Sequence, residues 1–331
     1  MSLLAHSSQP ASSYPQGTHQ AFRQLGSLHN NNNNKHRRSY PGSRARATSS
    51  CRVYLEEDSC PPGKLPQKGG LLLQRLLGLG RTPTQDEVLQ ILSVELLDNW
   101  KRNLRHGTVV LNSLARHRLP LTAKHVLASM LLRSMEANVF HYNAAISACE
   151  KGRQWQLALN LLSSMPGMRI KPDEISYSAA ISACEKGGQW QLALEFLNSM
   201  HGVRVIPNEI TYNAAISACS RGGQWQLALS LLSSMPVMKA IPDEISRNAA
   251  ISACEKGGQW RVALSLLSSM PGARVLPNEI SYNAAMSAFE KGGQWQLAVS
   301  LLSSMPDARV IPDEISYNAA ISSCENEGIG R

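Results

Sequence analysis

The last 193 residues of the chain repeat every 35 positions without a gap. Self-similarity at a period of 20 to 50 residues is typical of small supersecondary units that stack into an array. Such an array offers a long surface on which the same chemical position recurs once per unit, rather than a single pocket. The residues that mark the period are Trp155, Trp190, Trp225, Trp260 and Trp295; Pro172, Pro207, Pro242, Pro277 and Pro312; and Tyr142, Tyr177, Tyr212, Tyr282 and Tyr317, with Arg247 as the exception in the tyrosine register.

One unit, residues 174–208, contains two helical patterns. Apolar residues recur three and four positions apart over 177–184 and again over 190–200, which is the spacing of one helix face. The Lys-Gly-Gly sequence at 186–188 separates them, because a basic residue and a glycine favour a helix end. Pro207 ends the second pattern, because proline does not continue a helix. Each unit is therefore predicted to be a helix-turn-helix hairpin.

A single hairpin cannot bury both of its apolar stripes, so neighbouring hairpins must cover them. We therefore expect an all-α fold, an α-solenoid of stacked helix-turn-helix hairpins forming a superhelix, with a disordered N-terminal segment. Residues 69–138 are interpreted as degenerate helical repeats, with a worn unit at 104–138 and helical patterns at 71–79 and 88–97. The complete units are 139–173, 174–208, 209–243, 244–278 and 279–313, followed by a partial unit at 314–331.

Charge divides the chain into two regions. Residues 1–138 carry 18 Lys and Arg against 8 Asp and Glu, whereas residues 139–331 carry 15 against 16. The basic leader at 1–68 has its first acidic residue at Glu56 and is rich in serine. This composition is typical of an organelle transit peptide, for a chloroplast or mitochondrion, and equally of a plain disordered tail. No stretch predicts a membrane span, and any nucleic-acid affinity of the near-neutral array must rest on local contacts.

Cysteine occurs once per repeat rather than in pairs. Equivalent helices of adjacent hairpins are expected about 10 Å apart, beyond the reach of a disulfide. We therefore interpret these residues as small buried side chains in a reducing compartment. They are Cys149, Cys184, Cys219, Cys254 and Cys324, with Phe289 in the fifth unit.

The repeated motif resembles the pentatricopeptide repeat family. The consensus unit contains Tyr-Asn, then Lys-Gly, an Ala-Leu stripe that ends in Ser-Met, and a closing Pro-Asp or Pro-Asn, with single departures at Ser178, Arg221, Arg247 and Val299. Tetratricopeptide repeats have a different signature and a period of 34. The resemblance covers residues 139–331 fully and 104–138 loosely. It implies binding of single-stranded RNA in organelles, one nucleotide per repeat, with the RNA running 5′ to 3′ from the N- to the C-terminal units.

The resemblance further implies that two residues per unit read the base. Counting Glu174 as position one, these are the fifth residue and the thirty-fifth, which follows the closing proline; we call them a reading pair. A carboxylate only accepts hydrogen bonds and suits uracil or guanine, whereas an amide both donates and accepts and suits adenine or cytosine. A structural alternative is that the thirty-fifth residue is only a helix N-cap. The reading pairs are Asn143 with Asp173, Ser178 with Asn208, Asn213 with Asp243, Asn248 with Asn278 and Asn283 with Asp313; Asn318 is the fifth residue of the partial unit, and Thr108 with Asn138 is the pair of the worn unit.

Two further rows have roles that the resemblance implies. Apolar side chains at position two would slot between bases, or would instead form a hydrophobic staple at the helix entry. Cations at the end of each first helix would contact phosphates, or would instead only complement the helix dipole. The position-two residues are Phe140, Ile175, Ile210, Ile245, Ile280 and Ile315, the cations are Lys151, Lys186, Arg221, Lys256 and Lys291, and a second basic row without an assigned role is Arg169, Arg204, Lys239, Arg274 and Arg309.

The sequence contains no pattern that predicts catalysis. Histidines lie almost entirely within the first 141 residues, and no Cys-x-x-Cys occurs, so we expect no enzyme activity, no metal and no cofactor. The tryptophans are expected to pack between hairpins rather than to stack on bases. The expected partner is single-stranded RNA, with a helper protein or second chain, and without a membrane or a small-molecule substrate. The alternative is a protein-binding scaffold built on the same solenoid.

Overall fold

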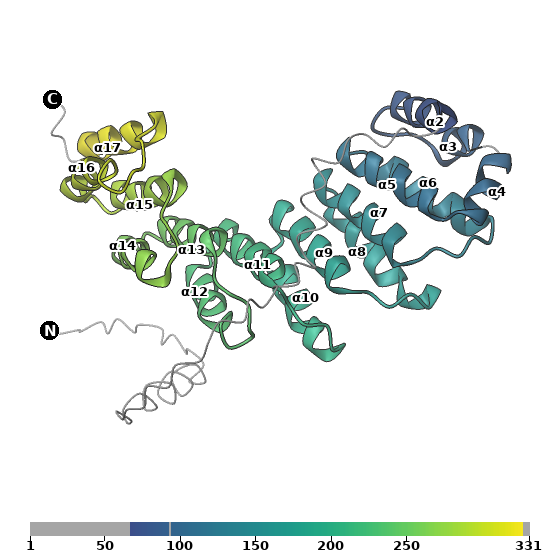
Figure 1. Cartoon of the computed structure of the whole chain (residues 1–331). Coiled ribbons are helices and arrows are strands. Elements are labelled where there is room, and N and C mark those ends of the chain that lie inside the picture. Colours follow the sequence, from purple (N-terminus) through teal and green to yellow (C-terminus); the bar gives the residue numbers. More distant parts are fainter. Residues whose placement is uncertain (1–66, 93, 327–331) are drawn as a thin grey trace, which may run out of the picture. The chain divides into compact units, whose positions relative to one another are not determined.

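The computed structural model describes residues 67–92 and 94–326. Every regular element in these two ranges is a helix, and the helices follow one another in hairpins (Figure 1). The all-α solenoid predicted from the repeat is therefore confirmed. The predicted disordered leader and transit peptide, up to residue 66, and the last five residues of the partial unit lie outside the described residues.

Each complete unit of the array contains two helices. The first helix begins directly after an Asp or Asn that caps it and ends where a glycine leaves the helix. The second begins at the tryptophan. The first helices are α7 Val139–Lys151, α9 Glu174–Lys186, α11 Glu209–Arg221, α13 Glu244–Lys256, α15 Glu279–Lys291 and α17 Glu314–Asn326, and the second helices are α8 Trp155–Ser164, α10 Trp190–Gly202, α12 Trp225–Ser234, α14 Trp260–Ser269 and α16 Trp295–Ser304; short 3₁₀ helices, η3 Pro166–Met168 and η4 Pro271–Ala273, follow α8 and α14.

The segment before the array is also helical, with one departure from prediction. A helix was expected over 88–97, but α3 ends at Ile91 and α4 begins at Val94. The backbone of Leu92, with φ −80° and ψ 80°, leaves the helical region and divides the pattern. Helices α5 and α6 form a hairpin inside the worn unit. The elements are α2 Gln67–Gly78, α3 Gln85–Ile91, α4 Val94–Arg102, α5 Arg105–Arg116 and α6 Pro120–Leu132.

Consecutive first helices form a continuous row from α5 to α17, each packed on the next. Each second helix packs on its own first helix and on the first helix of the following unit. This arrangement buries alanine, isoleucine and cysteine of the first helices. Burial raises the pKa of the Cys149 thiol to about 12 and that of Cys184 to about 11, so these thiols stay protonated. The interpretation of Cys149, Cys184, Cys219 and Cys254 as buried residues is confirmed.

The tryptophans that begin the second helices are half-buried. Trp155, Trp190, Trp225 and Trp260 lie against a glycine of the next unit, in agreement with the packing prediction. Among the described helices, none combines the length and the hydrophobicity of a membrane-spanning segment.

Candidate nucleic-acid interface

The thirty-fifth residue of each complete unit caps the first helix of the next. Asp173 Oδ1 accepts the backbone N–H of Ser176 at 2.8 Å, and Asn208 Oδ1 accepts that of Thr211 at 3.0 Å. Asp243, Asn278 and Asp313 accept equivalent bonds at 2.8 to 3.0 Å. These residues are therefore N-caps, and capping is compatible with contact to a base. Capping also fixes these side chains at the entrance of the first-helix row, one per unit.

The structure brings the two members of most reading pairs into direct contact. Asn143 Nδ2 donates to the Asp173 carboxylate at 3.0 Å and 3.3 Å. The pairs Asn213 with Asp243 and Asn283 with Asp313 have the same geometry, at 3.1 to 3.3 Å. In the fourth unit Asn248 Nδ2 donates to Asn278 Oδ1 at 3.2 Å. Residues thirty positions apart thus form one polar group per unit.

The second unit is built differently, because its fifth residue is a short serine. The hydroxyl of Ser178 lies 2.8 Å from Thr211 Oγ1 and 2.7 Å from the backbone carbonyl oxygen of Glu174, and its one hydrogen can go to either. Thr211 Oγ1 in turn donates to Asn208 Oδ1 at 2.7 Å. Ser178 and Asn208 are therefore joined through the threonine rather than directly.

The worn unit lacks this arrangement. Within the described part of the chain, Thr108 and Asn138 share no hydrogen bond; Asn138 instead caps α7 by accepting the His141 N–H at 3.2 Å. Nε2 of the buried His141 side chain lies 3.0 Å from the Leu104 carbonyl oxygen. Asn318, on α17, is exposed.

In most reading pairs the thirty-fifth residue is the more exposed member. Asn143, Ser178 and Asn248 are 7 to 8% exposed whereas their partners are half-buried, and half-buried Asn283 is paired with exposed Asp313; in the third unit both members are half-buried. A ligand would therefore meet the thirty-fifth residue first. Hydrogen bonds from the Ser316 backbone N–H and hydroxyl lower the pKa of Asp313, so its carboxylate is ionised at neutral pH and acts only as an acceptor.

The position-two residues flank the reading pairs and are exposed. Their exposed fractions run from 40% at Ile175 to 62% at Ile280, and Phe140 is 50% exposed. An exposed apolar row beside polar pairs is the arrangement that a base wedge requires.

The predicted phosphate-contact row is mostly engaged in ion pairs between adjacent units. Lys186 Nζ lies 2.6 Å from Glu150 Oε1, Arg221 Nε lies 2.6 Å from Glu185, and Lys291 Nζ lies 2.7 Å from Glu255. These ion pairs between units were not predicted from the sequence. A Glu-to-Lys spacing of 36 residues is the signal that could have revealed them.

Lys256 is different from its equivalents. The residue 36 positions before Lys256 is Ser220, where the paired cations have a glutamate. No ion pair of Lys256 occurs among the described residues. Lys151 is in the same situation, because its register partner is Ala115.

The second basic row has a backbone role. Arg169, Arg204, Lys239, Arg274 and Arg309 all have φ between 58° and 63°, in the left-handed region. The N–H of Arg169 donates to the Pro166 carbonyl after α8, as in a helix-ending turn. These cations are exposed, and they follow the ends of the second helices.

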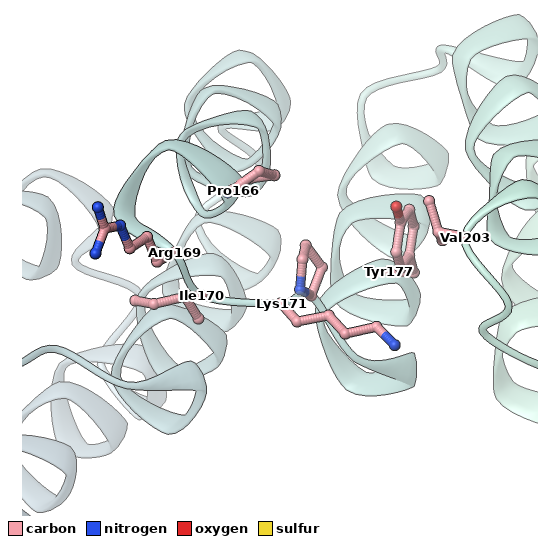
Figure 2. Close-up of a pocket in the computed structure, with 7 residues that line it drawn as sticks. Pro166, Arg169, Ile170, Lys171, Tyr177 and Val203 are labelled. Carbon is pink, nitrogen blue, oxygen red and sulfur yellow. The ribbon is translucent and has the colours of Figure 1, made fainter.

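A shallow pocket of about 370 Å³ lies beside the connection between α8 and α9 (Figure 2). Tyr177 and Val203 line one side, and Pro166, Arg169 and Ile170 line the other. It contains no reading-pair residue. In residues 67–92 and 94–326, no group of three or more His, Cys, Asp or Glu could hold a metal ion.

The chain is similar in fold to solved structures of helical-repeat proteins. The pentatricopeptide repeat protein PPR10 from maize is 20% identical with a TM-score of 0.56, over 83% of this chain and 46% of that chain. A structure of PPR10 in complex with an 18-nt psaJ RNA element is 17% identical with a TM-score of 0.45, over 79% and 46%. Nuclear protein-only RNase P 2 from Arabidopsis thaliana is 12% identical with a TM-score of 0.49, over 56% and 42%. This chain thus spans less than half the length of these proteins.

Family comparisons match nearly the whole array. The PPR repeat family matches residues 137–186 and 277–326, the pentatricopeptide repeat domain matches 175–221, and the PPR repeat matches 210–239 and 245–275. No curated protein matches the chain significantly. Together with the 35-residue hairpins and the solenoid fold, these matches identify the chain as a member of the pentatricopeptide repeat family.

Proposed function

We propose that this protein is a sequence-selective adaptor for single-stranded RNA, with about one base bound per repeat. The observation that carries the proposal is the recurrence of reading pairs at the start of the first helices. Each pair offers a partly exposed carboxylate or amide beside an exposed apolar side chain. This combination supplies a hydrogen-bonding edge and a stacking surface for an unpaired base.

The chemistry of the pairs gives a base sequence. Asp173, Asp243 and Asp313 accept hydrogen bonds and suit uracil beside the longer Asn at position five. Asn208 beside the small Ser178 suits adenine, and Asn278 beside Asn248 suits a pyrimidine. The proposed target is 5′-U-A-U-(C or U)-U-3′. Five complete units distinguish only about a thousand sequences, so a helper protein or a second chain would extend the recognised site.

Substitution of Asn208 by aspartate tests the assignment. In binding measurements with short RNAs that differ only at the second base, Asn208→Asp should move the preference from A toward G, because a carboxylate accepts from guanine N1–H. The matched control is Asn198→Asp, which adds the same charge at an exposed position on α10. Unchanged base preference in Asn208→Asp would refute the assignment of this pair.

The biological setting that we propose is a chloroplast or mitochondrion, where the protein would act in RNA processing, stability or translation. The basic, serine-rich and initially acid-free leader supports this setting. Fusion of residues 1–68 to a fluorescent protein tests it, and uniform fluorescence throughout the cell would contradict it.

A protein-binding scaffold is the second candidate, and one exposed row favours it. The residue before the closing proline is aliphatic in four units and is 72 to 79% exposed; these residues are Ile206, Ile241, Leu276 and Ile311. Exposed apolar surface of this kind can bind a partner protein. Salt separates the two candidates, because RNA affinity should fall steeply with ionic strength whereas apolar protein contacts should not.

A further inference from the structure

We propose that the buried hydroxyl at position three of the second and later units is a positioning residue, which determines the atom that the preceding thirty-fifth residue presents to the base. This inference rests on the proposed RNA-binding function and deepens it. The third-position hydroxyls belong to side chains that are 0% exposed: Ser176, Thr211, Ser246, Ser281 and Ser316.

The hydroxyl connects both members of a reading pair. Ser176 Oγ lies 2.6 Å from Asn143 Oδ1 and 2.9 Å from Asp173 Oδ1. The hydroxyl has one hydrogen to donate, and the shorter distance assigns it to Asn143 Oδ1, while the Asp173 carboxylate, which only accepts, faces Nδ2 of Asn143. The hydroxyls of Ser281 and Ser316 lie 2.6 to 3.0 Å from the equivalent oxygens of the fourth and fifth units.

An asparagine at position thirty-five is oriented by these donors. Asn208 Oδ1 accepts both the backbone N–H of Thr211 and its hydroxyl, at 3.0 Å and 2.7 Å. The oxygen is thus held toward the helix, and Nδ2 remains for a ligand. Asn278 Oδ1 likewise accepts the backbone N–H of Ser281 and lies 3.0 Å from its hydroxyl, which has Asn248 Oδ1 as a second acceptor at 2.6 Å. Nδ2 of Asn278 donates to the exposed carboxylate of Glu244.

The capped amide of Asn208 therefore offers a base only its N–H donor, because its oxygen is already bonded to Thr211. A donor matches the ring-nitrogen acceptor of adenine or cytosine and opposes the N–H of guanine or uracil. Rotation of the amide by 180° would present an oxygen and reverse this preference. The hydroxyl and the N–H of position three oppose that rotation. The hydrogen bonds that cap the helix thus also determine which base is preferred.

Aspartate does not depend on the hydroxyl in this way, because either of its oxygens accepts. Asp173 Oδ1 is bonded to Ser176, and Oδ2 is left with only the Asn143 amide, at 3.3 Å. In the third unit the Ser246 hydroxyl instead donates to the Asp243 backbone carbonyl at 2.9 Å, yet Asp243 still caps α13 and still accepts from Asn213. The third-position hydroxyl should thus control selectivity only where residue thirty-five is Asn.

The test compares equivalent hydroxyl deletions at an Asn pair and at an Asp pair. Thr211→Val keeps the shape of the side chain and should reduce the A-over-G affinity ratio at the second base by about two- to tenfold, the worth of one hydrogen bond. Thr211→Ser, which keeps the hydroxyl, should retain the parent ratio. Ser176→Ala should leave the U-over-C ratio at the first base unchanged.

Affinities would be measured with full-length protein and short RNAs varied at one base, and thermal melting would be recorded for each variant. Ser281→Ala, read out as the C-over-U ratio at the fourth base, provides a second deletion if Thr211→Val does not fold. A structural role alone would lower the affinity for all RNAs equally and leave the ratios unchanged, and this result would overturn the inference. Parent protein without RNA affinity would instead overturn the proposed function.

Discussion

The indole of Trp155 fills the space beside Gly187, so that a Cβ atom added to this glycine would lie 2.3 Å from the indole Cδ1. An added Cβ would lie equally close, at 2.3 to 2.4 Å, to the indoles of Trp190, Trp225 and Trp260 at the glycines 32 residues after them. The following glycine has another role. Gly188 has φ +70° and no neighbouring atom within 4 Å of an added Cβ. One glycine permits close packing, and the next permits a left-handed turn.

Gly187→Ala should destabilise the array by about 1–3 kcal/mol, because the methyl group overpacks the contact with Trp155. Chemical denaturation of the full chain measures this change. Gly188→Asn is the matched control and should change stability by less than about 0.5 kcal/mol, because asparagine tolerates the left-handed region. Equal effects of the two substitutions would show that backbone conformation, rather than the indole, requires the first glycine.

Local patterns made the hairpins predictable, whereas contacts between units were harder to predict. The end of α9 at Gly187 follows from the backbone properties of glycine, whereas α10 already ends at Gly202, before Pro207 is reached. The ion pair of Lys186 with Glu150 and the bond of Ser176 to Asn143 join residues 36 and 33 positions apart. Such contacts depend on how one hairpin sits on the next, which helical periodicity within a hairpin does not specify. Reading pairs were located by family resemblance, and capping explains only half of each pair.

Lys256→Gln should weaken RNA binding and reduce the slope of log affinity against log salt by about 0.7, the contribution of one phosphate contact on a single strand. The reason is that Lys256 faces Ser220 in the register where other units supply a glutamate. Lys186→Gln is the control, because Lys186 already neutralises Glu150 at 2.6 Å. Binding titrations at several salt concentrations measure both slopes. Equal slope changes in the two variants would mean that both lysines contact phosphates or that neither does, and would contradict the prediction.

The joint between the worn unit and the array should weaken in acid. Burial lowers the pKa of His141 below 6.5, although its hydrogen bond to the Leu104 carbonyl opposes the shift. In the neutral ring, Nδ1 accepts the Asn138 N–H at 3.1 Å while Nε2 donates to Leu104. A protonated Nδ1 could not accept this bond.

The sign of the pH effect follows from linkage. Because the unfolded histidine binds a proton first, stability is full above about pH 6.5 and falls as the pH decreases toward the lower folded-state pKa of His141. Burial and the neighbouring Lys124 lower the pKa of His125 as well, so it adds a change of the same sign. Denaturation of the parent and of His141→Ser at pH 7.5 and at lower pH should show a smaller loss in the variant, which carries the residue found in most other units. Identical losses of stability in the parent and in His141→Ser would show that a group other than His141 causes the pH effect.

Arg247→Tyr should stabilise the fourth unit, because arginine occupies a position where other complete units bury tyrosine. Tyr177, Tyr212 and Tyr282 are 3 to 8% exposed. The Nε atom of Arg247 is buried without a hydrogen-bond partner among the described residues, and its Nη1 donates to Ser269 at 3.4 Å. Leaving a buried donor unsatisfied costs about 1–3 kcal/mol.

The gain in Arg247→Tyr should be about 1 kcal/mol or more, combining removal of this donor with burial of an aromatic ring. A higher denaturation midpoint at unchanged slope would show it. Tyr212→Arg introduces the reverse change at an equivalent position and should destabilise the third unit. If Arg247→Tyr lowered the midpoint while Tyr212→Arg also lowered it, the fourth unit would have repacked around its arginine, and the tyrosine register would no longer describe its core.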